Sequence, residues 1–311
     1  MPEISVVIPV FNGERFIADA VGSVQAQTFR PREIIVVDDG STDRSGKVIG
    51  QLSGPVSISL RRQENRGPGV ARNAGIAAAQ GEWLAFLDAD DIWYPEKLAI
   101  QIEYIKLHPR VALFYSDMDS VDTEGTIIER SFLAKEQRRR SKKALDVFSL
   151  IYGGQPSPYP SSVLLRSDVF AQAGGFDPSF RCNEDTDLFE RVFRIAPAMF
   201  IPQSLTQYRR RAVDSPERAA AWEEGYFLLL DRLSTRWRND PGKRVFLLRE
   251  YMRRHEKRGV AHMQSQDYRQ ARISFRQGLS YYPWSWRVLR RWGVTFLPGI
   301  RRRYSLRKKK R

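Results

Sequence analysis

The sequence predicts an α/β fold, built on a mostly parallel, doubly wound sheet and followed by a smaller α-helical region. Two observations in the first hundred residues predict the sheet. Short apolar runs rich in β-branched residues alternate four times with segments of helical apolar spacing. Polar side chains, many of them acidic, follow where those runs end. Ligands bind at the carboxyl ends of strands in such sheets, so these polar residues are candidates for a functional site.

The predicted elements follow one another with short connections. Strands are expected at residues 4–9, 33–37, 56–60 and from 83 onward, with helices at 14–27, from 42 or 43 to about 52, and at 67–79. A further strand is expected at 111–116, followed by a hairpin turn at 122–126. The Gly- and Pro-rich stretch 153–160 is expected to form a loop.

The composition is that of a globular chain. Its 311 residues are 42% hydrophobic, enough to fill a core. The longest apolar runs fall short of the roughly 20 residues of a membrane-spanning helix, and the first residues do not resemble a signal peptide. Cys182 is the single cysteine, which fits a reducing compartment. We therefore expect a cytoplasmic protein.

The net charge of +15 is concentrated in the last quarter of the chain. Residues 1–105 carry a net −4, residues 106–235 carry 0, and residues 236–311 carry +19. Such asymmetry indicates that the C-terminal region meets a polyanion, namely acidic lipid, nucleic acid or an anionic polymer.

The fourth predicted strand ends in the sequence Asp88-Ala89-Asp90-Asp91. Because side chains alternate along a strand, Asp88 and Asp90 are expected to point the same way. Two adjacent carboxylates repel unless a cation lies between them, and hard oxygen ligands favour Mn²⁺ or Mg²⁺. The alternative is that these aspartates cap the following helix.

A dinucleotide-binding site is one alternative for this sheet edge, because it also places an acid after the second strand. Its G-x-G-x-x-G turn is missing, since the first strand is followed by Phe11-Asn12-Gly13, with one glycine. A nucleotide can still bind through a carboxylate for the base, an aromatic ring, an arginine for phosphate and a cation for a diphosphate. Those four groups are present in Asp39, Phe11, Arg72 and the Asp88/Asp90 pair.

Four segments resemble, in order and spacing, the family 2 glycosyltransferases of GT-A fold, which is Rossmann-like. They are residues 7–12, 36–43, 65–75 and 86–91. The resemblance covers about residues 1–215 and implies a nucleotide-sugar donor, most often a UDP-sugar, together with a divalent metal ion.

The resemblance also implies roles for individual residues on the donor side. Asp39 would bind the nucleobase beside the turn from Pro9 to Phe11, and Asn65 and Arg72 would hold the nucleotide. Asp88 would lie near the ribose and the metal, and Asp90 would ligate the metal. Two interpretations of Asp38 remain open. It would bind the donor, or it would be a turn carboxylate that caps the helix after Ser41.

A second motif, farther along the chain, continues the resemblance. Residues 174–177 read Gly-Gly-Phe-Asp, and Glu184 and Asp185 follow at the start of a predicted helix. In inverting members of the family the aspartate of this pair is the general base, which implies Asp185 here, with Glu184 as a second acid beside it. The alternative is that these acids only favour the positive end of the helix dipole.

The chain departs from the family pattern at Tyr208-Arg209-Arg210-Arg211, where many members have Tyr-Arg-x-His. An arginine does not ligate a cation. Arg211 would instead contact the diphosphate directly, or belong to a basic surface cluster.

The region after residue 215 is expected to be helical at residues 216–283, with one tetratricopeptide-like hairpin between Gly259 and Pro283. Residues 284–311 form a basic aromatic tail with 11 Lys or Arg. This composition suits an anionic membrane surface, and equally nucleic acid or a solvated tail. The resemblance favours lipid, because many such transferases act on lipid-linked acceptors; the protein would then be peripheral on the inner face of the cell membrane.

The sequence thus predicts an inverting, metal-dependent transferase that moves a sugar to a hydroxyl of a glycan or lipid-linked acceptor, in cell-surface polysaccharide or glycolipid synthesis. Two alternatives remain. One is a basic nucleic-acid-binding protein with a structural α/β domain, which the resemblance disfavours. The other is a nucleotide-sugar sensor without catalysis.

Overall fold

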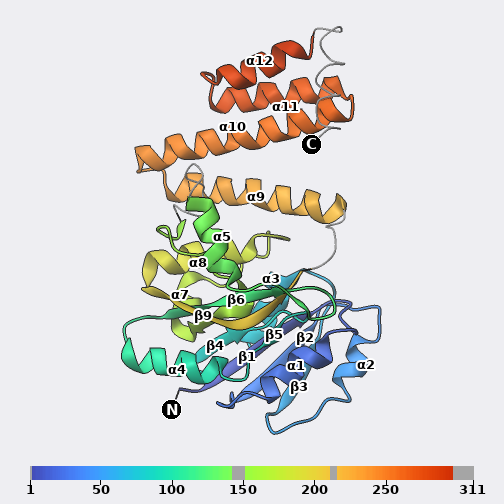
Figure 1. Cartoon of the computed structure of the whole chain (residues 1–311), viewed down its shortest axis with the longest axis vertical. Coiled ribbons are helices and arrows are strands. Elements are labelled where there is room, and N and C mark those ends of the chain that lie inside the picture. The colour runs from blue at the N-terminus through green and yellow to red at the C-terminus, as the bar shows by residue number, and fades with distance from the viewer. Residues whose placement is uncertain (1, 142–150, 211–215, 297–311) are drawn as a thin grey trace. The chain divides into compact units, whose positions relative to one another are not determined.

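The computed structural model describes residues 2–141, 151–210 and 216–296 (Figure 1). The chain divides into two compact units, residues 1–226 and residues 227–311. The larger unit contains the sheet and every predicted site residue up to residue 210.

One sheet organises the larger unit, and among the described residues it has nine strands. Its order is β3-β2-β1-β4-β8-β6-β9-β5, with β7 paired to β6. The bounds are β1 (Ile4–Val10), β2 (Glu33–Asp38), β3 (Ile58–Arg62), β4 (Trp83–Phe86), β5 (Ile92–Trp93), β6 (Leu113–Val121), β7 (Ile127–Glu129), β8 (Val163–Arg166) and β9 (Ala198–Arg209).

The predicted α/β fold class is confirmed. Strands β3, β2, β1 and β4 are parallel neighbours, as the strand–helix alternation predicts. The other half is mixed, because β8 runs antiparallel to both β4 and β6, while β6 and β9 are parallel. Strand β6 continues to Val121 since it pairs with β9 along its length, and the predicted turn at 122–126 connects it to β7.

Helices cover both faces of the sheet in this unit (Figure 1). They are α1 (Ile17–Gln25), α2 (Ser45–Ile49), α3 (Pro68–Ile76), α4 (Lys97–Leu107), α5 (Phe132–Ser141), α7 (Ser167–Ala173) and α8 (Glu184–Ile195), with a 3-10 helix η1 (Pro160–Ser162). Helix α2 is shorter than predicted. Strand β3 begins two residues later than predicted, since its first pair with β2 joins Ile58 to Ile34.

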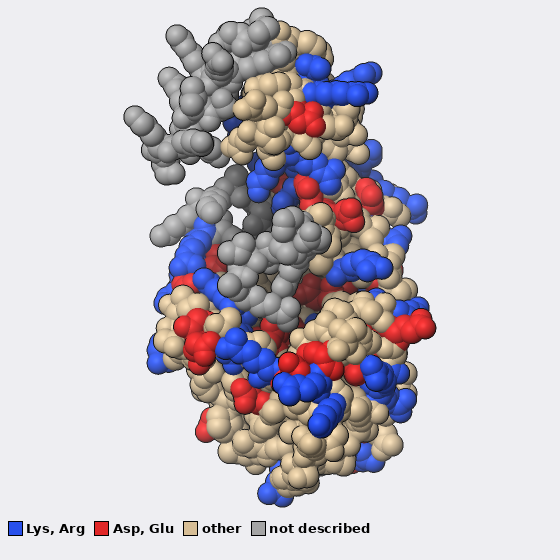
Figure 2. Space-filling view, turned by 90° about the vertical axis from the view of Figure 1, so that its right-hand side faces the viewer, with Lys and Arg blue, Asp and Glu red and all other residues tan. Residues whose placement is uncertain are grey.

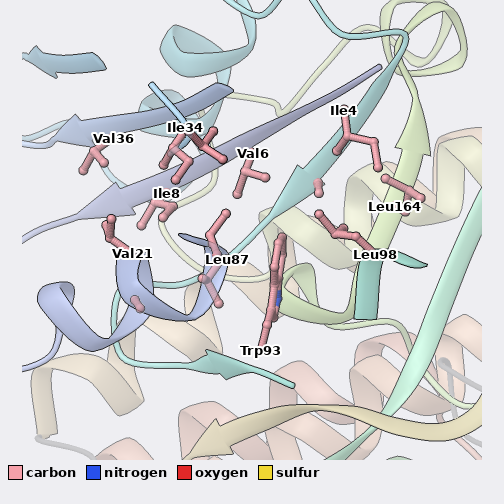
Figure 3. Close-up of a cluster of buried hydrophobic side chains, with 14 of the residues drawn as sticks. Ile4, Val6, Ile8, Val21, Ile34, Val36, Leu87, Trp93, Leu98 and Leu164 are labelled. Atoms are coloured by element: carbon pink, nitrogen blue, oxygen red, sulfur yellow. The ribbon is translucent and has the colours of Figure 1, made fainter. Parts of the chain in front are cut away.

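The core explains why β1 is apolar throughout. Ile4, Val6 and Ile8 point to one face, where they pack with side chains of β2, α1 and α4 (Figure 3). On the other face Val7 meets α3, where a Cβ added to Gly75 would lie 2.5 Å from Val7 Cγ1. A strand buried on both faces has no polar side, which is the pattern of a central parallel strand.

The smaller unit is helical, as predicted. Its helices are α10 (Pro241–Gln264), α11 (Tyr268–Tyr281) and α12 (Trp286–Val294), and α9 (Pro216–Arg236) crosses the division between the units. Asp240 and Asp267 cap α10 and α11 by accepting hydrogen bonds from backbone N–H groups. Helices α10 and α11 pack closely where Gly259 faces Phe275, two of the residues behind the tetratricopeptide-like prediction.

The apolar character of the helices and the distribution of surface charge were predicted from the sequence, and the structure describes both. Among the described residues, no helix has the length and apolar character needed to cross a membrane. On the face shown in Figure 2, the described basic and acidic side chains are interspersed.

Candidate active site

The first group of predicted residues lies where β2 ends. Asp39 is buried, and its Oδ1 accepts hydrogen bonds from Gln63 Nε2 at 2.7 Å and from the backbone N–H of Arg66 at 3.0 Å. Its Oδ2 accepts one from the backbone N–H of Gly67 at 2.8 Å. Gly67 has φ +91° and precedes α3. Asp39 therefore fixes the loop that leads into α3, and any nucleobase would share its oxygens with these donors.

The neighbouring turn brings the first and second strand ends together. Asp38 is buried and accepts a hydrogen bond from the backbone N–H of Ser41 at 2.8 Å, the turn contact that the sequence left as an alternative. Asn12 Oδ1 accepts one from the N–H of Thr42 at 2.9 Å. Beside this turn, the ring of Phe11 is 49% exposed and available to a ligand.

The remaining donor-side residues differ in exposure. Pro9 is buried within β1, where it pairs with Val37 of β2. Asn65 is exposed, and a Cβ added to Gly40 would lie 2.8 Å from its backbone nitrogen. Gly40 has φ +79°, so this close approach requires glycine.

Arg72 joins the two distant motifs. Its Nη2 donates to Asp88 Oδ1 at 2.6 Å, and its Nη1 donates to Glu184 Oε1 at 2.8 Å. Burial lowers the pKa of Arg72, but the carboxylates of Asp88 and Glu184 more than offset this, and the pKa is raised overall. Arg72 is 3% exposed and lies 5.4 Å from the centre of the Phe176 ring. The guanidinium thus connects the end of β4 to the start of α8.

A neighbour of Arg72 holds the Gly-Gly-Phe-Asp segment in place. Asn73 Nδ2 donates to the carbonyl of Phe176 at 2.8 Å, and Asn73 Oδ1 accepts from the N–H of Phe176 at 3.0 Å. Gly175 has φ +70°, and a Cβ there would lie 3.1 Å from Asn73 Oδ1. Sequence reasoning assigned no role to Asn73, although it lies within the motif at 65–75.

Asp185 lies in the first turn of α8, beside Glu184. Burial, and then the charge of Glu184, raise the pKa of Asp185 to about 7, against an opposing effect of Arg72. Its Oδ1 accepts a hydrogen bond from the N–H of Thr186 at 2.7 Å. The side chain is partly exposed, whereas Glu184 is buried. A partly accessible carboxyl that titrates near neutrality has the properties of a general base.

The turn that carries Asp88 and Asp90 is anchored from two sides. Asp91 is buried, and it accepts hydrogen bonds from Ser161 Oγ at 2.6 Å and from the N–H of Arg209 at 2.9 Å. Ser161 Oγ also accepts from the N–H of Asp88 at 3.0 Å. Burial raises the pKa of Asp91, and Asp90 and Asp88 add to the effect. Asp91 is thus a structural acid within the motif.

Arg209 completes this anchor. Its Nε donates to the carbonyl of Asp90 at 2.9 Å, and its Nη1 donates to the carbonyls of Asp122 and Thr123 at 3.1 and 2.8 Å. It is 5% exposed and lies 4.7 Å from the centre of the Phe16 ring. The sequence marked Arg209 only as part of a departing motif, and its contacts depend on β9 returning to the site edge. Arg211 lies outside the described residues.

The residues that would hold a divalent cation are the carboxylates of Asp88 and Asp90. The Asp88 side chain is 34% exposed and has one oxygen on Arg72, while Asp90 is partly exposed. In the described part of the chain, no cluster of three or more His, Cys, Asp or Glu could hold a metal. Magnesium-type sites commonly use one or two carboxylates and complete their coordination with substrate phosphate and water.

The predicted residues therefore meet at the carboxyl edge of β1, β2 and β4. Asp39 holds Gly67 ahead of α3, Arg72 of α3 binds Asp88 and Glu184, and Glu184 adjoins Asp185. The acids and the buried arginines Arg72 and Arg209 thus lie at one edge of a mixed α/β sheet, where the resemblance to the GT-A fold implies the donor site.

Comparisons with known proteins agree with the family that the sequence motifs indicate. Residues 5–158 match the family model described as glycosyl transferase family 2. A glycosyltransferase from Rickettsia prowazekii is 32% identical over 232 residues, which are 72% of this chain and 69% of that protein. The succinoglycan biosynthesis protein ExoO of Rhizobium meliloti is 30% identical over 189 residues, 60% of this chain and 54% of ExoO. The chain belongs to glycosyl transferase family 2.

Solved structures show the same fold. The crystal structure of S. aureus TarS 1–349 in complex with UDP-GlcNAc has a TM-score of 0.66 at 20% identity, covering 97% of this chain and 88% of that chain. The complex of TarS 1–349 with UDP has a TM-score of 0.62. The shares of relatives that this chain spans vary, from 69% of the R. prowazekii protein to 32% of one from Rickettsia bellii.

Proposed function

We propose that this protein is an inverting, metal-dependent glycosyltransferase that moves a sugar from a UDP-sugar to a hydroxyl of an acceptor glycan or lipid-linked acceptor. The observation that carries the proposal is the bridge made by Arg72. It connects Asp88, on the donor side, to Glu184, which adjoins a carboxyl with a pKa of about 7. A nucleotide-sugar site and a candidate base are thereby held at one sheet edge.

Asp185 would act as the general base. An acceptor hydroxyl has a pKa far above neutrality, so it needs a base as it attacks the anomeric carbon. In this step the proton passes to the Asp185 carboxylate, the new bond forms between the acceptor oxygen and the anomeric carbon, and the bond from that carbon to the diphosphate oxygen breaks. The electron pair leaves with the nucleoside diphosphate. A single displacement inverts the anomeric configuration and needs one carboxylate.

The donor side would use residues at the ends of β1, β2 and β4, together with Asn65 after β3. The exposed ring of Phe11 would cover the base, with Asp39, Asn65 and the turn after Pro9 beside it. Asp88 and Asp90 would hold Mn²⁺ or Mg²⁺, whose charge would stabilise the departing diphosphate. Arg72 has Nη1 on Glu184 and Nη2 on Asp88, so we assign it a positioning role around the donor in place of the direct nucleotide contact that the resemblance implies.

The donor and pathway are drawn from relatives. TarS has been solved with UDP and with UDP-GlcNAc, which favours a UDP-sugar here. The name of ExoO refers to succinoglycan biosynthesis, which favours a role in polysaccharide synthesis.

The smaller unit would bring the protein to a membrane. Trp284 and Trp286 are 86% and 76% exposed, beside a basic C-terminal sequence. Exposed tryptophan next to Arg and Lys is typical of segments that lie in the interface of anionic membranes. Peripheral attachment would bring the enzyme to a lipid-linked acceptor.

The deciding experiment measures UDP release from UDP-glucose, UDP-galactose and UDP-N-acetylglucosamine, with Mn²⁺, Mg²⁺ or EDTA. We expect one donor to be turned over, with the rate lost in EDTA and in Asp90→Ala. Binding of a UDP-sugar without turnover would select the sensor alternative. Turnover that is unchanged in EDTA would remove the metal from the mechanism.

A further inference from the structure

Gln63 directly follows β3, and its side chain contacts the carboxylate that would bind the nucleobase. Gln63 Nε2 donates to Asp39 Oδ1 at 2.7 Å. Within the described residues, this is the one hydrogen bond that the Gln63 side chain makes. A primary amide has two N–H donors and a carbonyl acceptor. The second N–H and Oε1 of Gln63 are therefore left for a ligand, and the residue is partly exposed.

The contact with Asp39 fixes which way the amide of Gln63 points. Turning the amide over would place its carbonyl oxygen against the carboxylate, where two acceptors repel. The backbone is fixed as well, because the N–H of Gln63 donates to the carbonyl of Asp38 at 3.0 Å. A Cβ added to Gly40, which has φ +79°, would lie 3.3 Å from the carbonyl oxygen of Gln63. The amide donor is thus held beside Asp39 before any ligand binds.

Asp39 keeps the capacity to accept one more hydrogen bond. Among the described residues, its Oδ2 accepts from the N–H of Gly67 alone, and a carboxylate oxygen has about two lone-pair sites. Asp39 is also tied to the end of β1, since its N–H donates to the carbonyl of Val10 at 2.8 Å. Asp39 and Gln63 therefore form a hydrogen-bond acceptor beside a hydrogen-bond donor at the edge of the sheet where the donor nucleotide is expected.

We infer that Gln63, together with Asp39, selects the nucleobase and is a specificity-determining residue of the transfer. The inference rests on the proposed function and deepens it, because it names the residue that distinguishes a uracil nucleotide from a cytosine or adenine nucleotide. A base bound to Asp39 lies within reach of Gln63, since the two side chains are already hydrogen-bonded.

The hydrogen-bonding edge of each base explains the selection. Uracil has an N–H between two carbonyl groups, so its N–H donates to Asp39 while a carbonyl accepts from Gln63 Nε2. Guanine has the same N–H and carbonyl pair on a larger ring. Cytosine and adenine have the opposite pair, a ring nitrogen that accepts beside an amino group that donates. They place an acceptor against the carboxylate and a donor against Nε2, and a site left with unpaired polar groups rejects such an analogue.

The alternative is that Gln63 only holds Asp39 in place, and the two roles differ in a measurable ratio. A holding role weakens the binding of every nucleotide alike, whereas base selection changes the affinity for one base relative to another. The test compares wild type with Gln63→Met, which keeps the length of the side chain and removes the amide. The control is Gln80→Met, because Gln80 is an exposed glutamine ahead of β4 whose Oε1 accepts from Arg32 Nη2 at 2.7 Å.

The dissociation constants of UDP, GDP, CDP and ADP are measured by titration calorimetry in Mn²⁺, with each variant checked by its thermal unfolding midpoint. These four ligands share the ribose and the diphosphate and differ in the base. We expect wild type to bind UDP at least about tenfold more tightly than CDP or ADP. Gln63→Met should weaken UDP binding about three- to tenfold and lower the ratio of the CDP and UDP constants by at least that factor. Gln80→Met should match wild type.

An equal loss of affinity for all four nucleotides in Gln63→Met would overturn the inference alone, as would an unchanged ratio of the CDP and UDP constants. Wild-type protein that binds CDP or ADP as tightly as UDP would overturn it too. Tighter binding of GDP than of UDP would support selection by Gln63 and contradict the UDP-sugar of the proposed function. If wild type binds none of the four, the inference falls with the proposed function.

Discussion

Arg72 and Glu184 lie 112 positions apart in the chain, yet Arg72 Nη1 donates a hydrogen bond to Glu184 Oε1 at 2.8 Å in the buried interior of the site. The same guanidinium binds Asp88, so a single side chain connects the donor-side turn with the helix that carries Asp185. Two carboxylates held on the fork of one arginine keep a fixed separation, which a flexible ammonium would not impose.

Loss of this arginine should destabilise the fold as well as the site. Arg72→Ala leaves the buried carboxylate of Glu184 without its partner, which we expect to lower the free energy of unfolding by about 3–5 kcal/mol. Arg72→Lys should unfold closer to wild type but lose most of its transfer rate. Urea denaturation and UDP release measure the two effects.

The matched control is Arg15→Ala. Arg15 pairs with Glu124, but their side chains are 58% and 71% exposed. An exposed pair contributes about 0–1 kcal/mol, so this variant should unfold close to wild type. Equal urea midpoints for Arg15→Ala and Arg72→Ala would contradict the bridging role of Arg72.

The pH dependence of transfer should report Asp185. With its pKa raised to about 7, the basic form is present above neutrality and is lost below it. The rate kcat/KM should therefore fall about tenfold per pH unit below 7 and level off above it. Asp185→Asn should abolish transfer, while Asp168→Asn, at an exposed carboxyl, should keep the wild-type profile. A flat wild-type profile between pH 5 and 8 would exclude Asp185 as the base.

The same shift predicts a change in stability with pH. The folded state binds the Asp185 proton more tightly than the unfolded chain, because the pKa rises from 3.8 to about 7 on folding. This group therefore makes the protein less stable as the pH rises from about 4 to 7. Asp185→Asn should remove that part of the dependence and unfold at a higher temperature than wild type at pH 8.

The parallel half of the fold could be predicted because its signals are local. Strands β1, β2 and β4 are short apolar runs, and a helix follows each of β1, β2 and β3 before the next strand begins. The acids that follow β2 and β4 come within two residues of the strand ends. The turn at 122–126 could be predicted for the same reason, because its signal lies within those five residues. The mixed half was not predicted, since the insertion of β8 between β4 and β6 brings together residues about 80 and 50 positions apart.

The sequence predicts which residues belong to the site, but not which of them contact one another. The motifs named Arg72, Asp88 and Asp185, but nothing in their spacing shows that Arg72 binds Glu184. Ser161 lies next to a proline-rich stretch and carried no signal, because its role depends on η1 meeting the turn after β4. These are long-range contacts that only the folded chain defines.

Ser161 gives a test of how the turn that carries Asp88 and Asp90 is held. Ser161→Ala removes a hydrogen-bond partner of the part-buried Asp88 N–H and of the buried Asp91 carboxyl, and should cost about 1–3 kcal/mol of unfolding free energy. The Mn²⁺ concentration for half-maximal turnover should rise, because the backbone of Asp88 loses its hydrogen bond to Ser161. The exposed Ser280, whose Oγ donates to the carbonyl of Gln277 at 2.7 Å, provides the control Ser280→Ala. An unchanged Mn²⁺ requirement in Ser161→Ala would show that Arg209 suffices as the anchor.

The helical unit can be tested with a pair of glycines. A Cβ at Gly259 would lie 2.5 to 2.8 Å from three ring carbons of Phe275, whereas one at Gly293 of α12 meets nothing within 4 Å. Gly259→Ala should lower the unfolding free energy by about 1–3 kcal/mol through overpacking. Gly293→Ala should be neutral, or stabilising by up to about 1 kcal/mol, because alanine favours the helix. Equal thermal midpoints for the two variants would contradict the close packing of α10 on α11.

Attachment to a membrane should depend on both charge and tryptophan. Co-sedimentation with vesicles of phosphatidylglycerol and phosphatidylcholine should exceed that with phosphatidylcholine alone and weaken as NaCl is raised, because the net +19 of residues 236–311 is screened by salt. Trp284→Ala combined with Trp286→Ala should lower the bound fraction at fixed salt, since two rings that are 86% and 76% exposed would no longer enter the interface. Leu107→Ala, at an apolar residue of α4 that is 73% exposed, should bind as wild type does. Binding to RNA that equals vesicle binding and is unaffected by the tryptophan substitutions would favour a nucleic-acid role for this unit.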